Sequence, residues 1–194
     1  ERINRIFEGT NEINRLLISS ITLKKAILEE LPLRDAISMR SEDWFSKISA
    51  DNDFSDSERV VEYCRSACLF TLNELILKYG QDMKNNQWIL EPFANMICSL
   101  SIVDTGLKVV SKIKNDIKIL ERRELLELSL CQQYNILNSE MEKILSHIHS
   151  IDEFKNINKM ISGYKEKLNY HPDEISLMNK VADRLYTHGK YYLD

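Results

Sequence analysis

Glycine and proline are scarce in this sequence, which has five glycines and three prolines among its 194 residues. Because these residues punctuate the turns between short strands, their scarcity favours a few long helices over many strands. No stretch approaches the roughly 18 consecutive apolar residues of a membrane span. Nothing at the start resembles a signal peptide. The composition therefore predicts a packed, helical protein.

An excess of positive charge is also absent, because the formal net charge is −4. The surface as a whole is therefore not expected to bind nucleic acid. Four cysteines lie within apolar helical patterns, at Cys64, Cys68, Cys98 and Cys131. Cysteines in such patterns are usually small buried hydrophobes, which favours a reducing compartment. No second pair of residues with metal-ligand spacing accompanies Cys64 and Cys68. His147 and His149 point in different directions on a helix, so no metal site is expected.

Apolar residues recur at a spacing close to 3.6 in most of the chain, which predicts an all-α protein. One helix is expected from about Asn11 to Glu29, and a shorter one from Pro32 to about Trp44. The polar stretch 49–55 reads as a linker. The expected organisation is therefore a helical segment over 1–48, a linker over 49–55, and a helical extension over 56–194.

Five apolar stripes follow the linker and predict an antiparallel bundle of four to five long helices. The stripes begin at Val61, Phe93, Leu126, Phe154 and Ile175. The clearest of them consists of Leu126, Leu130, Tyr134, Leu137, Met141, Leu145 and Ile148, and the last of Ile175, Met178, Ala182 and Leu185. Pro92 either begins the second of these helices or kinks a helix that starts near Asn86.

The segment best suited to carry chemistry lies at the beginning of the chain, where residues 2–17 read RINRIFEGTNEINRLL. Gly9 would interrupt a helix, and Thr10 or Asn11 can cap the next one. A carboxylate at such a break, here Glu8, is held by backbone on both sides and is suited to act as a general base or to contact a dinucleotide. From Glu8 to Asn11 alone, a simple helix–turn–helix corner would be the better reading.

The flanking residues change that interpretation. The segment closely resembles the acyl-CoA dehydrogenase motif R-I-[FY]-E-G-T-N-E-I-x-R, with an ungapped match. The stretch from Thr22 to Leu33 resembles the version of the family with a C-terminal extension, which includes the very-long-chain type. The chain opens on Glu1 rather than methionine, which suggests a C-terminal fragment of a longer enzyme.

The resemblance implies a mechanism and a set of roles. Glu8 would remove the α proton of a fatty acyl-CoA thioester while a hydride leaves the β carbon for FAD, giving a trans-2-enoyl-CoA in fatty-acid β-oxidation. Phe7 and Gly9 would line the thioester end of the substrate pocket. Thr10, Asn11 and Glu12 would lie along the flavin. At position 20, where some relatives use an arginine to contact CoA, this chain has a serine.

The resemblance also implies partners. These are fatty acyl-CoA, an electron-transferring flavoprotein and further copies of the chain, in the cytoplasm or, in a eukaryote, the mitochondrion. The fragment alone is expected to hold no FAD and to be inactive. Two alternatives remain: a non-catalytic interaction module for oligomer, membrane or partner contact, and an oxidase-like enzyme that passes electrons to oxygen. The basic stretch Lys108–Arg123 would meet an anionic membrane surface or form a solvated helix end.

Overall fold

The protein is described by a computed structural model that covers residues 10–41, 43–45, 48, 55–113 and 119–189. Within these ranges it is entirely helical and contains no strand, which confirms the all-α prediction. The helices are α1 (Asn11–Ile27), α2 (Leu33–Ser38), α3 (Asp56–Tyr79), the 3-10 helix η3 (Gly80–Asn85), α4 (Gln87–Lys112), α5 (Ile119–Ile148), α6 (Ile151–Leu168) and α7 (Glu174–His188).

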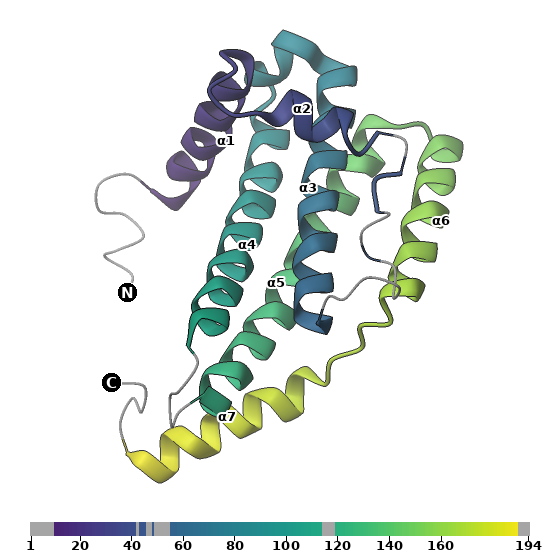
Figure 1. The fold of residues 1–194 in the computed structure, drawn as a ribbon. Helices are drawn as coiled ribbons and strands as arrows, with labels where there is room; N and C mark the ends of the chain where they lie inside the picture. Colours follow the sequence, from purple (N-terminus) through teal and green to yellow (C-terminus); the bar gives the residue numbers. More distant parts are fainter. Residues whose placement is uncertain (1–9, 42, 46–47, 49–54, 114–118, 190–194) are drawn as a thin grey trace.

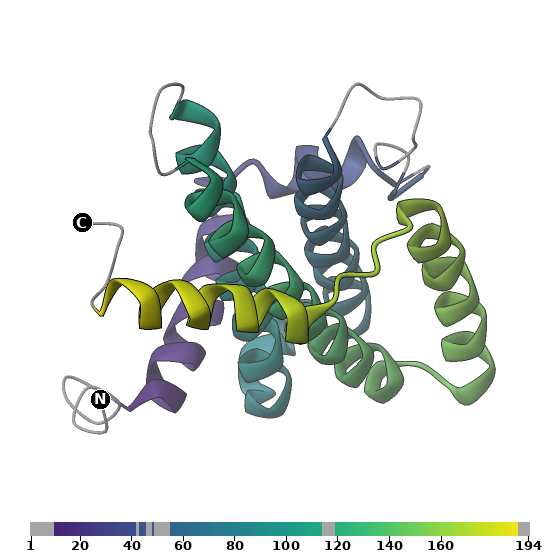
Figure 2. The same cartoon turned by 90° about the horizontal axis from the view of Figure 1, so that it is seen from below.

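Helices α3, α4 and α5 run side by side in alternating directions and form the centre of the bundle (Figure 1). Helix α1 packs against α4, and α2 against α3. Helix α6 descends beside the bundle, and α7 then crosses α5 obliquely, as Figure 2 shows from below. The extension is therefore an antiparallel bundle with one crossing helix at its end.

The helix ends follow from local sequence. Helices α3 and α6 both begin with a capping box, formed by Ser55 with Glu58 and by Ser150 with Glu153. Helix α3 ends at Gly80, whose φ of 52° is a conformation that glycine adopts without a steric penalty. These local signals set where the two helices begin and where α3 ends.

The second predicted helix is shorter than expected, because α2 ends at Ser38 rather than near Trp44. Beyond it the chain turns, and the Asp43 carboxylate accepts a hydrogen bond from the Phe45 amide at 3.2 Å. Phe45 is 1% exposed. Burying this ring requires the chain to turn into the core, which a continued helix would not do.

Pro92 lies inside α4, which starts after Asn86, so the second of the two alternatives for this residue is correct. By length and composition alone α4 is also apolar enough to cross a membrane. In this fold it packs against α1, α3 and α5. These contacts cover only part of its apolar surface, because 28% of its most apolar 18-residue window is buried.

One hydrophobic core runs through the molecule and includes residues from both sides of the predicted linker. Phe45 lies with its ring centroid 5.4 Å from that of Tyr63 in α3 and 4.9 Å from that of Tyr164 in α6. Tyr63 in turn contacts Tyr134 of α5 at 5.3 Å. The segment before the linker is thus packed into the bundle, while its assignment to a separate domain stays a prediction.

The clearest predicted stripe is buried, except for a half-buried Tyr134. The stripe predicted for α7 is wrong. Ile175 is 73% exposed and Met178 50% exposed, whereas Leu177 is 8% exposed. The helix turns a different side to α5, and this side carries Leu177 and Arg184, whose guanidinium pairs with Glu121 at 3.0 Å and with Glu124 at 2.7 Å.

Candidate functional site

The structure describes the predicted catalytic segment only from Thr10 onwards, at the start of α1. Glu8, Phe7 and Gly9 lie outside the described residues. Thr10 is the N-cap of α1, and its hydroxyl accepts a hydrogen bond from the Ile13 amide at 3.3 Å. Thr10 rather than Asn11 therefore caps the helix. The residue expected to act as base stands two positions before a defined helix N-terminus.

The first turn of α1 has the chemistry of an anion site. Asn11 is half-buried, and the Glu12 side chain is exposed. The first amides of a helix have no intrahelical acceptor, and the helix dipole adds partial positive charge there. Glu12 places a carboxylate in the same turn, so the amides and this side chain act in opposite directions on an anion. The three residues predicted to bind the flavin lie here, Thr10 at the cap and Asn11 and Glu12 in the first turn.

Two residues without a predicted role, Arg15 and Ser19, anchor helix α1 to α4. The Arg15 guanidinium lies 3.7 Å from the Glu91 carboxylate. The Ser19 hydroxyl is fully buried and donates to the Leu90 carbonyl oxygen at 2.6 Å. A serine on an otherwise apolar face is a possible signal of such a contact, although its partner 71 positions away is not visible in the sequence.

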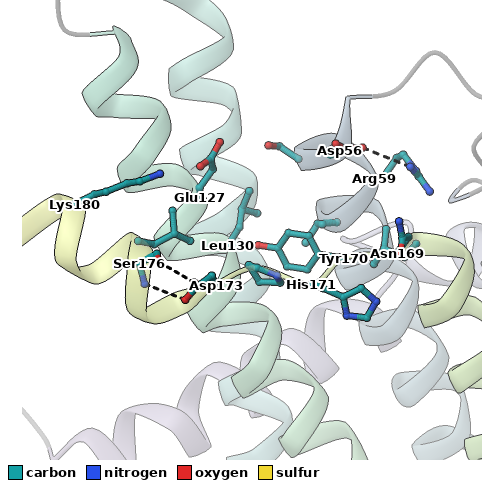
Figure 3. Close-up of a pocket in the computed structure, with 15 residues that line it drawn as sticks. Asp56, Arg59, Glu127, Leu130, Asn169, Tyr170, His171, Asp173, Ser176 and Lys180 are labelled. Carbon is teal, nitrogen blue, oxygen red and sulfur yellow. Dashed lines mark hydrogen bonds and ion pairs between the residues drawn. The ribbon is translucent and has the colours of Figure 1, made fainter.

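A second candidate is a polar cleft of about 450 Å³ between the start of α3, the middle of α5 and the segment joining α6 to α7 (Figure 3). Burial raises the pKa of the Tyr170 phenol, with smaller contributions from neighbouring Cys131 and Glu127. This phenol therefore stays protonated at neutral pH and is a poor base. His171 and Lys180 line the same cleft and are exposed.

Other polar groups of this cleft hold the fold together. The Arg59 side chain donates to the backbone carbonyl oxygens of Ile48 at 3.2 Å and Lys167 at 2.9 Å. The Asp173 carboxylate accepts from the amide and hydroxyl of Ser176 at 3.0 and 2.7 Å, and these bonds lower the pKa of Asp173. Arg59 and Asp173 are therefore engaged in bridging and capping.

Cys64, Cys68 and Cys131 are buried, as the sequence predicts, whereas Cys98 is half-buried. All four are free thiols. Burial raises the pKa of Cys64 to about 12 and that of Cys68 also well above its ordinary value. Within the described part of the chain, no cluster of His, Cys, Asp or Glu side chains has the arrangement of a metal site. The cysteines of α3 are therefore core residues.

Comparison with known proteins supports the resemblance seen in the sequence. The chain is 33% identical over 109 residues to a probable acyl-CoA dehydrogenase of Bacillus subtilis (strain 168), a match that covers 55% of this chain and 18% of that protein. No protein-family model matches the chain.

The fold is similar to that of an acyl-CoA dehydrogenase from Bacillus anthracis whose crystal structure contains FAD, with a TM-score of 0.83. This match covers 99% of the present chain and 33% of that one, at 24% identity. The chain thus spans a third or less of both relatives. In sequence and in fold, the chain is similar to acyl-CoA dehydrogenases, as the segment over residues 2–17 predicts.

Proposed function

We propose that this chain is the C-terminal region of an FAD-dependent acyl-CoA dehydrogenase, with its catalytic base at Glu8. The observation that carries the proposal is the ungapped motif over residues 2–17, which leads directly into the capped N-terminus of α1. The sequence relative and the fold neighbour, both acyl-CoA dehydrogenases, support it. The proposed reaction is α,β-dehydrogenation of a fatty acyl-CoA to a trans-2-enoyl-CoA in β-oxidation.

The Glu8 carboxylate would take the proton from the α carbon of the thioester. That C–H bond is a weak acid, so negative charge developing on the thioester oxygen must be stabilised, a role suited to the Glu8 backbone N–H. Phe7 and Gly9 would line the thioester end of the pocket. FAD, when bound, would supply the acceptor for the hydride that leaves the β carbon.

Thr10, Asn11 and Glu12 would hold the flavin at the N-terminus of α1. Arg15 and Ser19 hold α1 on α4. This contact would keep the first turn of α1 at a constant position relative to the Glu8 base. We further propose that an electron-transferring flavoprotein reoxidises the flavin, that the enzyme is cytoplasmic or mitochondrial, and that residues 1–194 alone are inactive.

The test is Glu8→Gln in the full-length protein. The amide has nearly the same shape but does not accept the α proton, so flavin reduction by acyl-CoA should slow by at least about 10²–10⁴-fold. Bleaching of the flavin absorbance under anaerobic conditions measures this step directly. Substrate affinity should change little, because the backbone N–H at position 8 remains.

The matched control is Glu12→Gln, which makes the same chemical change four residues later. Its main effect should be on FAD retention, whereas turnover of the flavin-loaded enzyme should stay near that of the unmodified protein. Near-normal flavin reduction in Glu8→Gln would remove Glu8 from the mechanism. The segment would then be a structural corner.

A second role, contact with other copies of the chain, is favoured by the exposed side of α7. Ile175, Met178 and Tyr186 share this side and are 73%, 50% and 86% exposed. Membrane contact through Lys108–Arg123 is also part of the proposal. Of that stretch, Lys108 already pairs with Asp104, while Lys112 and Arg123 are exposed.

A further inference from the structure

A second cavity, of about 680 Å³, lies between the last turns of α1, the short helix α2 and the corner where α3 passes into η3. This volume is within the range of pockets that enclose small organic ligands. Lys24 stands 14 positions after Thr10, so the helix rise places the cavity about 20 Å from the start of α1. It is therefore separate from the segment proposed to carry the dehydrogenase chemistry.

The walls of this cavity are mainly apolar. Leu23 and Met83 form part of the hydrophobic core and are 8% and 3% exposed. Ile37 is half-buried, and Ile76 is 41% exposed on the α3 side. The corner at Gly80 is open, because a Cβ atom placed on this residue would meet no atom within 4 Å. Such walls favour an aliphatic or aromatic group over a polar one.

The charged residues that line the cavity, Lys24 and Arg34, are both cationic. Lys24 is exposed on α1. Arg34 forms an ion pair with Glu29 at 3.2 Å, but both side chains are largely exposed, at 81% and 67%. An exposed pair of this kind is weak, so Arg34 can turn to a stronger anionic partner. The cavity thus combines apolar walls with positive charge.

We propose that this cavity binds a single-chain amphiphile with an anionic head group. The hydrocarbon chain lies against Leu23, Ile37 and Ile76, and the head group meets Lys24 and Arg34. The polar side chains of Ser20 and Asn73, which also line the cavity, offer hydrogen bonds near the head group. A carboxylate and a phosphate share this chemistry, so a free fatty acid and a lysophospholipid are both candidate sources.

The experiment is isothermal titration calorimetry of the full-length protein with dodecanoate below its micellar concentration. We expect saturable binding of one dodecanoate, and at least tenfold weaker binding of dodecanol and of dodecyltrimethylammonium. Lysophosphatidate titrated in parallel shows which head group binds more tightly. Absence of saturable binding with both anionic ligands would overturn the proposal, as would equal affinities for the anionic, neutral and cationic dodecyl compounds.

Two pairs of adjacent substitutions locate the bound ligand. Ile76→Asp should weaken dodecanoate binding at least tenfold, whereas Leu77→Asp, at a neighbouring exposed residue outside the cavity, should leave it unchanged. Lys24→Glu should weaken binding by about threefold to tenfold, and Lys25→Glu by less. Circular dichroism confirms that each variant is folded. Equal effects within either pair would contradict binding in this cavity.

The proposal does not depend on the dehydrogenase assignment. Lys24→Glu and Ile76→Asp should leave flavin reduction by acyl-CoA unchanged, because the cavity is at the far end of α1 from the proposed base. A loss of dodecanoate binding with normal flavin reduction supports a separate site. A parallel loss of both would assign dodecanoate to the substrate pocket and overturn the inference.

Discussion

At the scale of single residues, a chain of charged side chains joins the turn after α2 to helices α3 and α4. Arg40, after α2, donates to Glu62 at 2.5 Å and to the Ser66 hydroxyl at 2.7 Å. Arg65 donates to the other oxygen of Glu62 at 2.9 Å and also to Asp104 of α4. Because Glu62 is only 8% exposed at its side chain, its charge depends on these two arginines.

Asp104 should make stability depend on acidity. Partial burial raises the pKa of the Asp104 carboxyl. Hydrogen bonds from Lys108 and Arg65, together with their charges, lower the pKa by more, so it lies below the ordinary value for an aspartate. A carboxyl group whose folded pKa is depressed stabilises the protein above its unfolded pKa. This contribution is lost as the pH falls through the folded pKa. Asp104→Asn should therefore lower stability at pH 7 more than at pH 3.

Urea denaturation at both pH values measures this difference. Asp183→Asn, at an exposed position on α7, is the control and should change stability little at either pH. An equal loss of stability at pH 7 and pH 3 in Asp104→Asn would show that the carboxylate contributes through packing rather than through its charge.

The cysteines should differ in reactivity according to burial. Cys64 and Cys68 are inaccessible, and burial keeps them protonated at pH 8, whereas Cys98 is half-buried. Iodoacetamide should therefore modify Cys98 first in the native protein. Cys64 and Cys68 should be modified only after addition of guanidinium. Peptide mass spectrometry of timed samples identifies the modified thiols, and early modification of Cys64 would contradict the packing of α3.

At the scale of helices, the capping boxes are the features that the chain defines most locally. The Ser55 hydroxyl accepts from the Glu58 amide at 3.4 Å, and Glu58 accepts from the Ser55 amide at 2.8 Å. Ser55→Ala should cost about 1 kcal/mol of stability, since the first-turn amide loses its acceptor. Ser55→Thr keeps the hydroxyl and should cost less. Thermal unfolding of the two variants measures the difference, and equal losses would contradict a capping role.

The helices were largely predictable because their signals are short-range. The spacing of Val61, Cys64 and Leu72 identifies both α3 and its buried face. The rotation of α7 was not predictable, because Arg184 finds its carboxylate partners about 60 residues earlier. At the candidate site, the cap at Thr10 follows from local residue preferences. The contact of Ser19 with Leu90 depends on the packing of α1 on α4 and has no local signal.

At the scale of the whole molecule, apolar side chains of α1 and α7 are open to solvent in the part of the chain that the structure describes. On α1, Ile13 and Leu17 are 59% and 54% exposed, while the opposite side packs on α4. The N-terminal half of this side is where the remainder of a dehydrogenase would pack if the proposed function is correct. The second surface is the exposed side of α7.

If α7 joins copies of the protein, a charge on its exposed side should separate them. Met178→Asp should lower the molar mass found by size-exclusion chromatography with light scattering, because an unpaired carboxylate in an apolar interface is costly. Asn179→Asp adds the same charge at a neighbouring position and should leave the mass unchanged. An unmodified protein that is monomeric at every concentration tested would contradict the proposed contact.

The chain of charges from Arg40 to Asp104 also limits how this sequence can evolve. If Glu62 is lost first, Arg40 and Arg65 have fewer partners inside the bundle. If Arg40 is lost first, the buried Glu62 carboxylate keeps its negative charge with one fewer cation beside it. Stepwise replacement by apolar residues therefore passes through less stable intermediates, even if the final apolar set is stable. Descendants of this sequence should thus keep these residues or change them together, as correlated substitutions across the turn after α2 and helices α3 and α4.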